Sequence, residues 1–123
     1  MKILLVEDEE MLNGITAKYL RAENMTVDTC FNGQQAIDYV NTSSYDVIVM
    51  DIMMPIINGY EAAKRIRSLD REDAKKIPII AMTANAFTED RIRAKEAGMD
   101  EHVAKPIDVE LLIKVIHKLV KHN

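Results

Sequence analysis

Several features that would assign a protein to a broad class are missing from this sequence. Cys30 is the single cysteine among 123 residues, so an internal disulfide is excluded and we expect a buried, unreactive thiol. No apolar run approaches the ~20 residues of a membrane span, and Met1-Lys2 leads directly into a strand pattern instead of a signal peptide. The net charge of −4 argues against a nucleic-acid surface. These absences predict a cytoplasmic protein that binds neither nucleic acid nor a membrane directly.

The sequence also lacks internal repeats, low-complexity tracts and linker segments. Its length fits one domain and suffices for a hydrophobic core without disulfide or metal staples. The contents of 48% apolar and 29% charged residues are typical of an ordinary globular protein. We therefore expect residues 1–123 to form a single domain.

Strand and helix patterns alternate five times along the chain. The predicted strands are Lys2–Val6, Met25–Cys30, Asp46–Met50, Ile77–Met82 and Glu101–Ala104. The predicted helices are Glu10–Ala22, Gln34–Asn41, Gly59–Leu69, Thr88–Ala97 and a last helix that starts near Val109. This order predicts an α/β fold in which helices cover both faces of a parallel five-stranded sheet.

Two details of this prediction concern individual segments. The first helix has one apolar face at helical spacing, made of Leu12, Ile15, Tyr19 and Leu20. The run 68–76 is rich in charged residues, and we expect it to form a solvated, flexible loop that does not mark a domain boundary.

Polar residues directly follow four of the apolar runs. Glu7 and Asp8 come after the first run, and Asp51, Thr83 and Lys105 come after the third, fourth and fifth. Open α/β sheets bind ligands outside the carboxyl ends of their strands, so these side chains are expected to converge. Clustered carboxylates repel unless a cation joins them, and oxygen ligands suit Mg²⁺. The pattern predicts a site where a metal brings a phosphoryl group to an aspartate.

Each of these residues also has an ordinary structural interpretation. Glu7 and Asp8 could favour the start of a helix, although the acidic residues that follow them already serve that purpose. Thr83 alone could cap a helix, and Lys105 alone could be a surface lysine. Their common place at strand ends favours a site. The histidines show no metal-ligand spacing, and we expect His117 and His122 to be solvated.

Taken together, the motifs resemble the receiver domain of two-component response regulators. The segments that carry the resemblance are ILLVEDEE (3–10), VMDIMMP (49–55) with Asn58-Gly59, AMTANA (81–86), AGMD (97–100) and Lys105-Pro106. Each motif is weak alone, but their order and spacing over nearly the whole chain are specific. The resemblance implies a flavodoxin-like (βα)5 fold with strand order 2-1-3-4-5. The later segments look most like receivers of hybrid sensor histidine kinases.

The resemblance also implies a role for each site residue. Asp51 resembles the phosphoacceptor, and Glu7 and Asp8 resemble the acidic pair that organises Mg²⁺. With Asp51 and the main-chain carbonyl of Met53, this pair would hold the metal. In the family, the side chains at the positions of Met53 and Asn85 flank the path by which water approaches the phosphoryl group. Met53 cannot orient water through a strong hydrogen bond and Asn85 cannot act as a base, so we expect slow self-dephosphorylation.

The remaining site residues resemble the parts that respond to the phosphoryl group. Thr83 resembles the switch hydroxyl, and Lys105 resembles the ammonium whose bond to the next proline, Pro106, is usually cis in the family. The family often has an aromatic residue three positions before this lysine, and His102 stands at that position here.

The function implied is a phosphoacceptor switch rather than an enzyme. Asp51 would accept a phosphoryl group from a histidine kinase or histidine phosphotransfer domain and change the surface formed by the helix Thr88–Ala97, the strand Glu101–Ala104 and the last helix. We expect a monomer. The alternative of a Mg²⁺-dependent phosphohydrolase requires an aspartate where Met53 stands. The alternative of a flavodoxin requires a phosphate-binding loop where the acidic run 7–10 lies.

Overall fold

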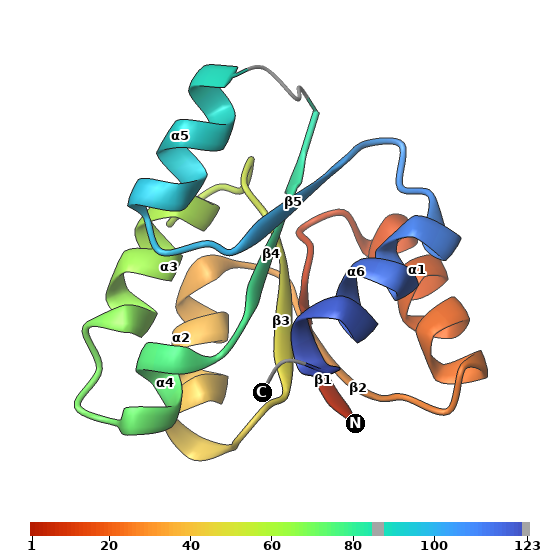
Figure 1. The fold of residues 1–123 in the computed structure, drawn as a ribbon, viewed down its shortest axis with the longest axis horizontal. Helices are drawn as coiled ribbons and strands as arrows, with labels where there is room; N and C mark the ends of the chain where they lie inside the picture. Colours follow the sequence, from red (N-terminus) through yellow and green to blue (C-terminus); the bar gives the residue numbers. More distant parts are fainter. Residues whose placement is uncertain (85–87, 122–123) are drawn as a thin grey trace.

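A computed structural model describes residues 1–84 and 88–121 and contains one parallel sheet (Figure 1). Its strands are β1 (Lys2–Val6), β2 (Thr26–Cys30), β3 (Val47–Asp51), β4 (Ile79–Thr83) and β5 (Glu101–Ala104). They lie in the order β2-β1-β3-β4-β5, and every neighbouring pair is parallel. The predicted flavodoxin-like topology is confirmed. The direction of winding reverses between β1 and β3, which is where such sheets leave a crevice for ligands.

Helices cover both faces of this sheet (Figure 1). They are α1 (Glu10–Ala22), α2 (Gly33–Thr42), α3 (Gly59–Arg67), α4 (Glu72–Lys76), α5 (Thr88–Glu96) and α6 (Val109–Lys121). Helices α1 and α6 cover one face, and the other four cover the opposite face. None of the helices in the described part of the chain has both the length and the apolar character needed to cross a membrane.

Alternate residues of the central strands supply two hydrophobic cores. In β1, Ile3 and Leu5 face α1 and α6, whereas Leu4 and Val6 face the helices on the other side. All residues of β3 and β4 are buried, as expected for parallel strands that are covered on both faces. Strand β2 lies at one edge of the sheet, and the predicted burial of Cys30, which is 1% exposed, is confirmed.

The predicted loop at 68–76 is wrong, because this run contains the short helix α4. Acidic residues fill its first turn and lysines its last, which suits the helix dipole. Ala74 is buried, and Arg71 pairs with Asp73 and donates a hydrogen bond to the carbonyl of Val40. One small buried residue leaves no apolar periodicity, so the sequence pattern does not reveal this helix.

The other predicted elements agree with the structure to within two residues at each end. The largest differences are the end of α3 at Arg67 and the start of β4 at Ile79. Strand β4 starts late because the amide of Ile77 still bonds to Asp73 at the end of α4. Proline at position 78 then has no N–H to give to a strand.

The apolar face predicted for α1 is mostly exposed. Only Leu20 of the four residues is buried, and Leu12, Ile15 and Tyr19 are 38%, 47% and 54% exposed. The helix instead faces the sheet with Asn13, among others, whose side-chain amide donates to the carbonyls of Glu7 and Cys30, both at 3.0 Å. These buried hydrogen bonds determine which face of α1 turns inward.

A single side chain joins three segments on the α3 side of the sheet. Arg67 donates hydrogen bonds to the carbonyl of Gly98 at 2.8 and 3.0 Å, to the carbonyl of Ala74 at 3.0 Å and to the carboxylate of Asp100 at 3.0 Å. Gly98 lies in the turn between α5 and β5 and has a φ of +96°, a backbone conformation that favours glycine. Arg67 therefore holds the end of α3, helix α4 and the turn before β5 together.

We predict that Arg67→Met lowers the free energy of unfolding by roughly 2 kcal/mol, because it leaves partly buried carbonyl groups without donors. Urea unfolding followed by circular dichroism measures the change. The matched control is Arg65→Met, which removes an exposed ion pair with Glu61 on the same helix and is expected to cost about 0.5 kcal/mol or less. Equal losses in the two variants would contradict the role given to Arg67.

Candidate functional site

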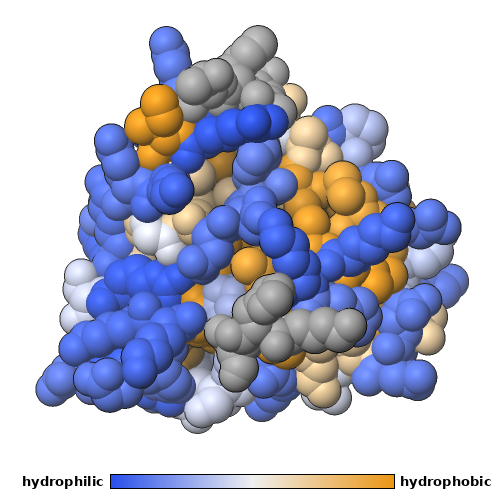
Figure 2. Space-filling view, viewed as in Figure 1, coloured by the Kyte–Doolittle hydropathy of each residue, from blue (hydrophilic) through white to orange (hydrophobic). Residues whose placement is uncertain are grey.

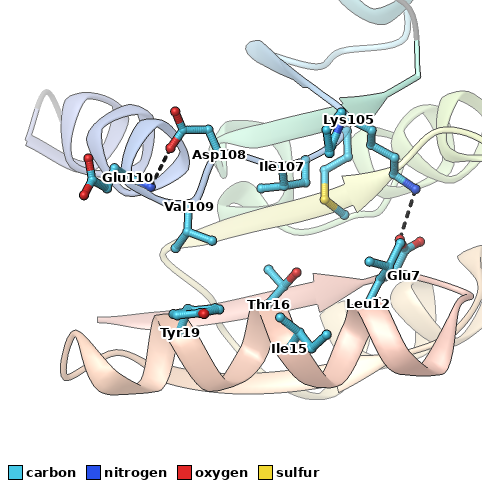
Figure 3. A pocket seen from close by; sticks show the side chains of 12 residues that line it. Glu7, Leu12, Ile15, Thr16, Tyr19, Lys105, Ile107, Asp108, Val109 and Glu110 are labelled. Atoms are coloured by element: carbon cyan, nitrogen blue, oxygen red, sulfur yellow. Dashed lines mark hydrogen bonds and ion pairs between the residues drawn. The ribbon is translucent and has the colours of Figure 1, made fainter.

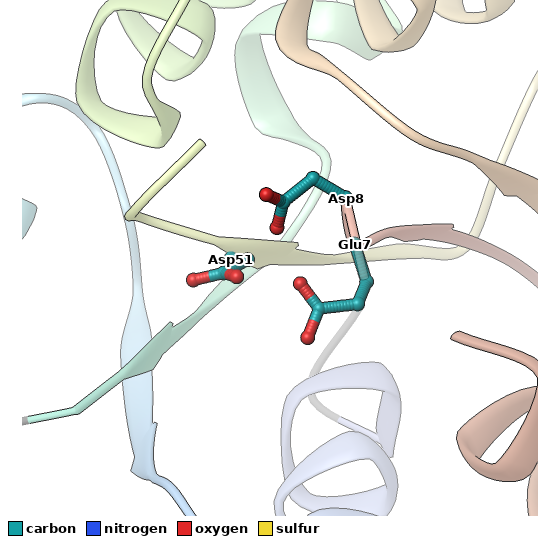
Figure 4. A group of neighbouring side chains, drawn as sticks. All are labelled: Glu7, Asp8 and Asp51. Carbon is teal, nitrogen blue, oxygen red and sulfur yellow. The ribbon is translucent and has the colours of Figure 1, made fainter. Parts of the chain in front are cut away.

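Acidic side chains from two strand ends meet at the carboxyl edge of the sheet (Figure 4). Glu7 and Asp8 follow β1, and Asp51 is the last residue of β3. One carboxylate oxygen from each of the three lies within 4.8 Å of the others. Glu7 and Asp51 are each 2% exposed, and Asp8 lies nearer to solvent. The structure thus brings together the three acidic residues that the sequence analysis singled out.

Lys105 reaches the same cluster from the segment that follows β5. Its ammonium group donates to Asp51 Oδ2 at 2.7 Å and to Glu7 Oε1 at 3.0 Å; Figure 3 shows the second of these bonds. The amide of Lys105 bonds to the carbonyl of Thr83 at 2.7 Å, and the Lys105-Pro106 peptide bond is cis. This backbone path fixes the point from which the side chain reaches Asp51.

The loop after β3 approaches the backbone of Asp51 closely. The amide of Gly59 bonds to the carbonyl of Ile52 at 2.9 Å, and a Cβ at Gly59 would lie 2.5 Å from the carbonyl oxygen of Asp51. Only glycine permits this approach. The amide of Met53 donates to Asp51 Oδ1 at 3.0 Å, while its side chain is 73% exposed. Both oxygens of the Asp51 carboxylate are therefore fixed by hydrogen bonds.

The cluster carries more negative charge than its own residues neutralise. Burial, followed by contact with Asp51, raises the pKa of Glu7 to about 8, although Lys105 opposes the shift. For Lys105, burial acts to lower the pKa, but the hydrogen bonds and charges of Asp51 and Glu7 outweigh it and raise the pKa. One ammonium group thus stabilises the cluster only in part.

These residues suit a divalent cation. Glu7 Oε2 is buried and has no hydrogen-bond partner among the described residues. Such an atom is costly unless a donor or a cation meets it. The available ligand atoms are all oxygens, which is the preference of Mg²⁺, and their excess charge would be neutralised by it. Magnesium therefore fits the cluster on its charge, its ligand type and its unpaired oxygen.

The remaining predicted residues lie around this cluster. Thr83 ends β4 and is 6% exposed. His102 is half-buried on β5, beside Ala81 of β4, and His117 is exposed as predicted. Asn85 and His122 fall outside the described residues, so the predictions made for them stay untested.

Sequence reasoning missed Asn13, which positions the acidic residues without belonging to the cluster. Its amide holds the carbonyl of Glu7 and so fixes the backbone from which both acidic side chains extend. In the sequence, Asn13 stands at helical spacing from Thr16 and Ala17, which are also buried in the structure. This small and polar face was overlooked because the larger apolar residues of the same helix form a more conspicuous pattern.

Comparison with known proteins finds relatives that are response regulators or receiver domains. The model of the response regulator receiver domain matches residues 3–117. The response regulator ArlR of Staphylococcus aureus is 36% identical over 122 residues, which cover 99% of this chain and 53% of ArlR. The chain thus spans about half the length of the curated relatives it matches.

Solved structures agree with this result. The receiver domain of the sensor histidine kinase PA1611 from Pseudomonas aeruginosa, solved with magnesium in its active-site cleft, is 34% identical, with a TM-score of 0.89 and coverage of 98% of this chain and 97% of that one. A chain in the co-crystal structure of the histidine phosphotransfer protein Ypd1 and the receiver domain of Ssk1 from Saccharomyces cerevisiae is 26% identical, with a TM-score of 0.88 and coverage of 97% and 88%.

We predict that stability without metal falls as pH rises, because of Glu7. Its raised pKa means that the folded state holds a proton that the unfolded state releases, so the contribution is complete below about 4.5 and is lost as pH rises to about 8. The expected loss is on the order of a few kcal/mol. Thermal or urea unfolding in EDTA measures it, and Glu7→Gln should flatten the curve over this pH range. An unchanged slope in Glu7→Gln would contradict the assignment.

Proposed function

The chain belongs to the response regulator receiver domain family, whose members are phosphoacceptors of two-component signalling, and on that premise we propose that Asp51 receives the phosphoryl group. The observation that carries this proposal is the position of Asp51. It is a buried carboxylate that lies beside those of Glu7 and Asp8 and accepts a hydrogen bond from the ammonium of Lys105. An acyl phosphate forms when this carboxylate displaces the donor nitrogen from phosphorus.

Receiver domains bind Mg²⁺ at an acidic site, and here we propose Glu7, Asp8, Asp51 and the main-chain carbonyl of Met53 as its ligands. Bound Mg²⁺ would neutralise the carboxylates and the oxygens of the phosphoryl group. The unpaired Glu7 Oε2 supports this proposal, because it offers an acceptor that no described residue uses. PA1611, a relative of this chain, has magnesium in its active-site cleft.

The side chains around Asp51 would then orient the reacting group. The Met53 amide keeps Oδ1 fixed. Lys105 holds Oδ2 in this structure, and its ammonium would exchange that oxygen for one on the incoming phosphoryl group. Thr83, at the end of β4, would donate its hydroxyl to another phosphoryl oxygen. Phosphoryl transfer needs positioning and charge neutralisation above all, and these groups supply both.

The same contacts would carry the signal. A shift of Thr83 toward the phosphoryl group moves the end of β4 and changes the surface of α5, β5 and α6. These helices correspond to the fourth and fifth helices of the sequence-based prediction, because α4 is additional. His102 lies on β5 within this surface, at the position where the family often has a larger aromatic side chain.

We further propose that residues 1–123 act as one receiver domain, as a monomer in the cytoplasm. The donor is a histidine kinase or a histidine phosphotransfer protein; Ssk1, which resembles this chain, was crystallised with a protein of the second kind. The sequence motifs favour a receiver of the hybrid-kinase type, which is reset by transfer back to histidine.

The acceptor assignment predicts that acetyl phosphate labels the protein only when Mg²⁺ is present, and that Asp51→Asn abolishes the label. The label should be stable in acid and labile in base, as an acyl phosphate is. Asp38→Asn, on the exposed side of α2, is the control and should keep full labelling. Intact mass spectrometry counts the phosphoryl groups. A fully labelled Asp51→Asn protein would reject the assignment.

A second prediction concerns the lifetime of the phosphorylated state. The Met53 side chain cannot orient water by a strong hydrogen bond, and Asn85 cannot act as a base, so self-dephosphorylation should be slow. A variant with Met53→Asn and Asn85→Glu should lose its phosphoryl group roughly five- to tenfold faster, since each water contact contributes about 1 kcal/mol. Decay after donor removal at equal Mg²⁺ measures both rates. Equal rates, or faster decay of the unmodified protein, would refute this interpretation.

A further inference from the structure

Basic side chains surround a cavity near the amino ends of β4 and β5, at the end of the sheet opposite the acidic cluster. The cavity has a volume of about 540 Å³, and the charged side chains that line it are Arg67, Lys75, Lys76, Lys95 and Asp100. Four of them are cations and one is an anion, so the lining has an excess of three positive charges. The whole chain has a net charge of −4, so this excess is local. A concave surface lined by charges of one sign attracts ions of the other.

The cations come from three helices on the same face of the sheet (Figure 1). Lys75 and Lys76 form the end of α4, and Lys95 lies one residue before the end of α5. Arg67 is the last residue of α3. Figure 2 shows mainly hydrophilic residues on the surface where α4 lies. Lysine at a helix end suits the helix dipole, but here the fold brings the basic ends of several helices to one cavity.

The ammonium groups of the cavity have few partners of their own. Within residues 1–84 and 88–121, neither Lys76 nor Lys95 forms an ion pair or a side-chain hydrogen bond. Lys75 has one exposed contact with Glu72 at 3.9 Å, which contributes little. All three ammonium groups are therefore able to contact an incoming anion without losing a strong bond.

The carboxylate of the cavity is already engaged. Asp100 Oδ2 accepts a hydrogen bond from Arg67 Nη2 at 3.0 Å and one from the amide of Ile79 at 2.8 Å. Arg67 also donates to the carbonyls of Gly98 and Ala74, so this side chain is a fixed part of the cavity wall. The pair of Asp100 and Arg67 is neutral as a unit, which leaves the three lysine charges unbalanced within the cavity.

The lining suits a highly charged ligand better than an aromatic one. Its apolar side chain, Met99, is 4% exposed and offers almost no surface for contact. None of the described residues that line the cavity is aromatic. The volume lies in the range of small-molecule sites. Lysine ammonium groups bind phosphate as compact point charges, and a chain of phosphate groups carries several negative charges on few atoms. Such a chain matches the three lysines.

From these observations, we propose that the cavity between the ends of α3, α4 and α5 binds an oligophosphate, which is a chain of two or more phosphate groups, either free or as the tail of a nucleotide. The ammonium groups of Lys75, Lys76 and Lys95 contact the phosphate oxygens. This site does not depend on the role proposed for Asp51. Strands β4 and β5 begin beside the cavity and lead to the acidic cluster at their other ends, so a ligand here occupies neither the metal site nor the phosphoacceptor.

Isothermal titration calorimetry with sodium tripolyphosphate tests the proposal, in buffer freed of divalent metal and at about 50 mM salt. Metal is left out because tripolyphosphate chelates Mg²⁺. One tripolyphosphate should bind per chain, with a Kd of about 1 mM or tighter. In two-dimensional NMR spectra, the amides of Lys76, Gly98 and Asp100 should shift during the titration. The amides of Asp8 and Asp51 should not shift.

Two double variants with equal net charge show whether the cavity itself binds the anion. The test variant carries Lys76→Glu and Lys95→Glu. The control carries Lys18→Glu and Lys114→Glu, at exposed positions of α1 and α6 on the opposite face of the sheet. The test variant should bind tripolyphosphate about tenfold more weakly or worse, whereas the control should change the Kd by about twofold or less.

Two further ligands identify the chemistry that is recognised. Equal affinity for ATP and tripolyphosphate, which we expect, identifies the phosphate chain as the whole ligand, and clearly tighter binding of ATP identifies a nucleotide; both results support the site. Citrate carries its charges on carboxylates and should bind more weakly than tripolyphosphate. Equal binding of citrate would mean that the cavity accepts any polyanion, such as an acidic peptide, and would reject the assignment to phosphate.

Three other results overturn the proposal. The first is the absence of saturable binding up to about 5 mM tripolyphosphate. The second is a set of NMR shifts confined to the edge of the sheet where Asp51 lies, which would place the anion at the acidic cluster. The third is equal weakening in the two double variants, which would mean that the net charge of the protein, and not the cavity, determines the affinity.

Discussion

The structure depends most on an imbalance of charge at the carboxyl edge of its sheet. Three carboxylates meet there, and the ammonium of Lys105 bonds to two of them. Burial makes the remaining charge costly, which explains both the raised pKa of Glu7 and the fit to a divalent cation. The strand order creates this arrangement, because it places β1 directly beside β3 and so brings Glu7 and Asp8 to Asp51. A bound divalent cation would neutralise this excess negative charge.

Much of this could be predicted from the sequence, because buried parallel strands give continuous apolar runs with polar residues at their ends. Asp51, Thr83 and Lys105 were found in that way, and the resemblance to a known family supplied the strand order. Helix α4 was missed because its single buried residue, Ala74, leaves no periodic pattern. The prediction of which face of α1 points inward was wrong, because the hydrogen bonds of Asn13 decide the orientation of the helix. No hydrophobic pattern reveals these bonds.

The orientation of α1 also bears on the acidic cluster. Leu12, Ile15 and Tyr19 stay exposed because the buried hydrogen bonds of Asn13 fix which face of the helix meets the sheet. The same asparagine also holds the backbone carbonyl of Glu7, so one residue links the orientation of α1 to the backbone that carries Glu7 and Asp8.

The most direct test of the central claim is to locate the phosphoryl group chemically. Reduction of a phosphorylated aspartate with borohydride converts it to homoserine, and peptide sequencing by mass spectrometry identifies the position. The account predicts homoserine at position 51, formed only when phosphoryl donor and Mg²⁺ are both present. Homoserine at Asp8 or at an aspartate outside the cluster, with Asp51 unchanged, would contradict it.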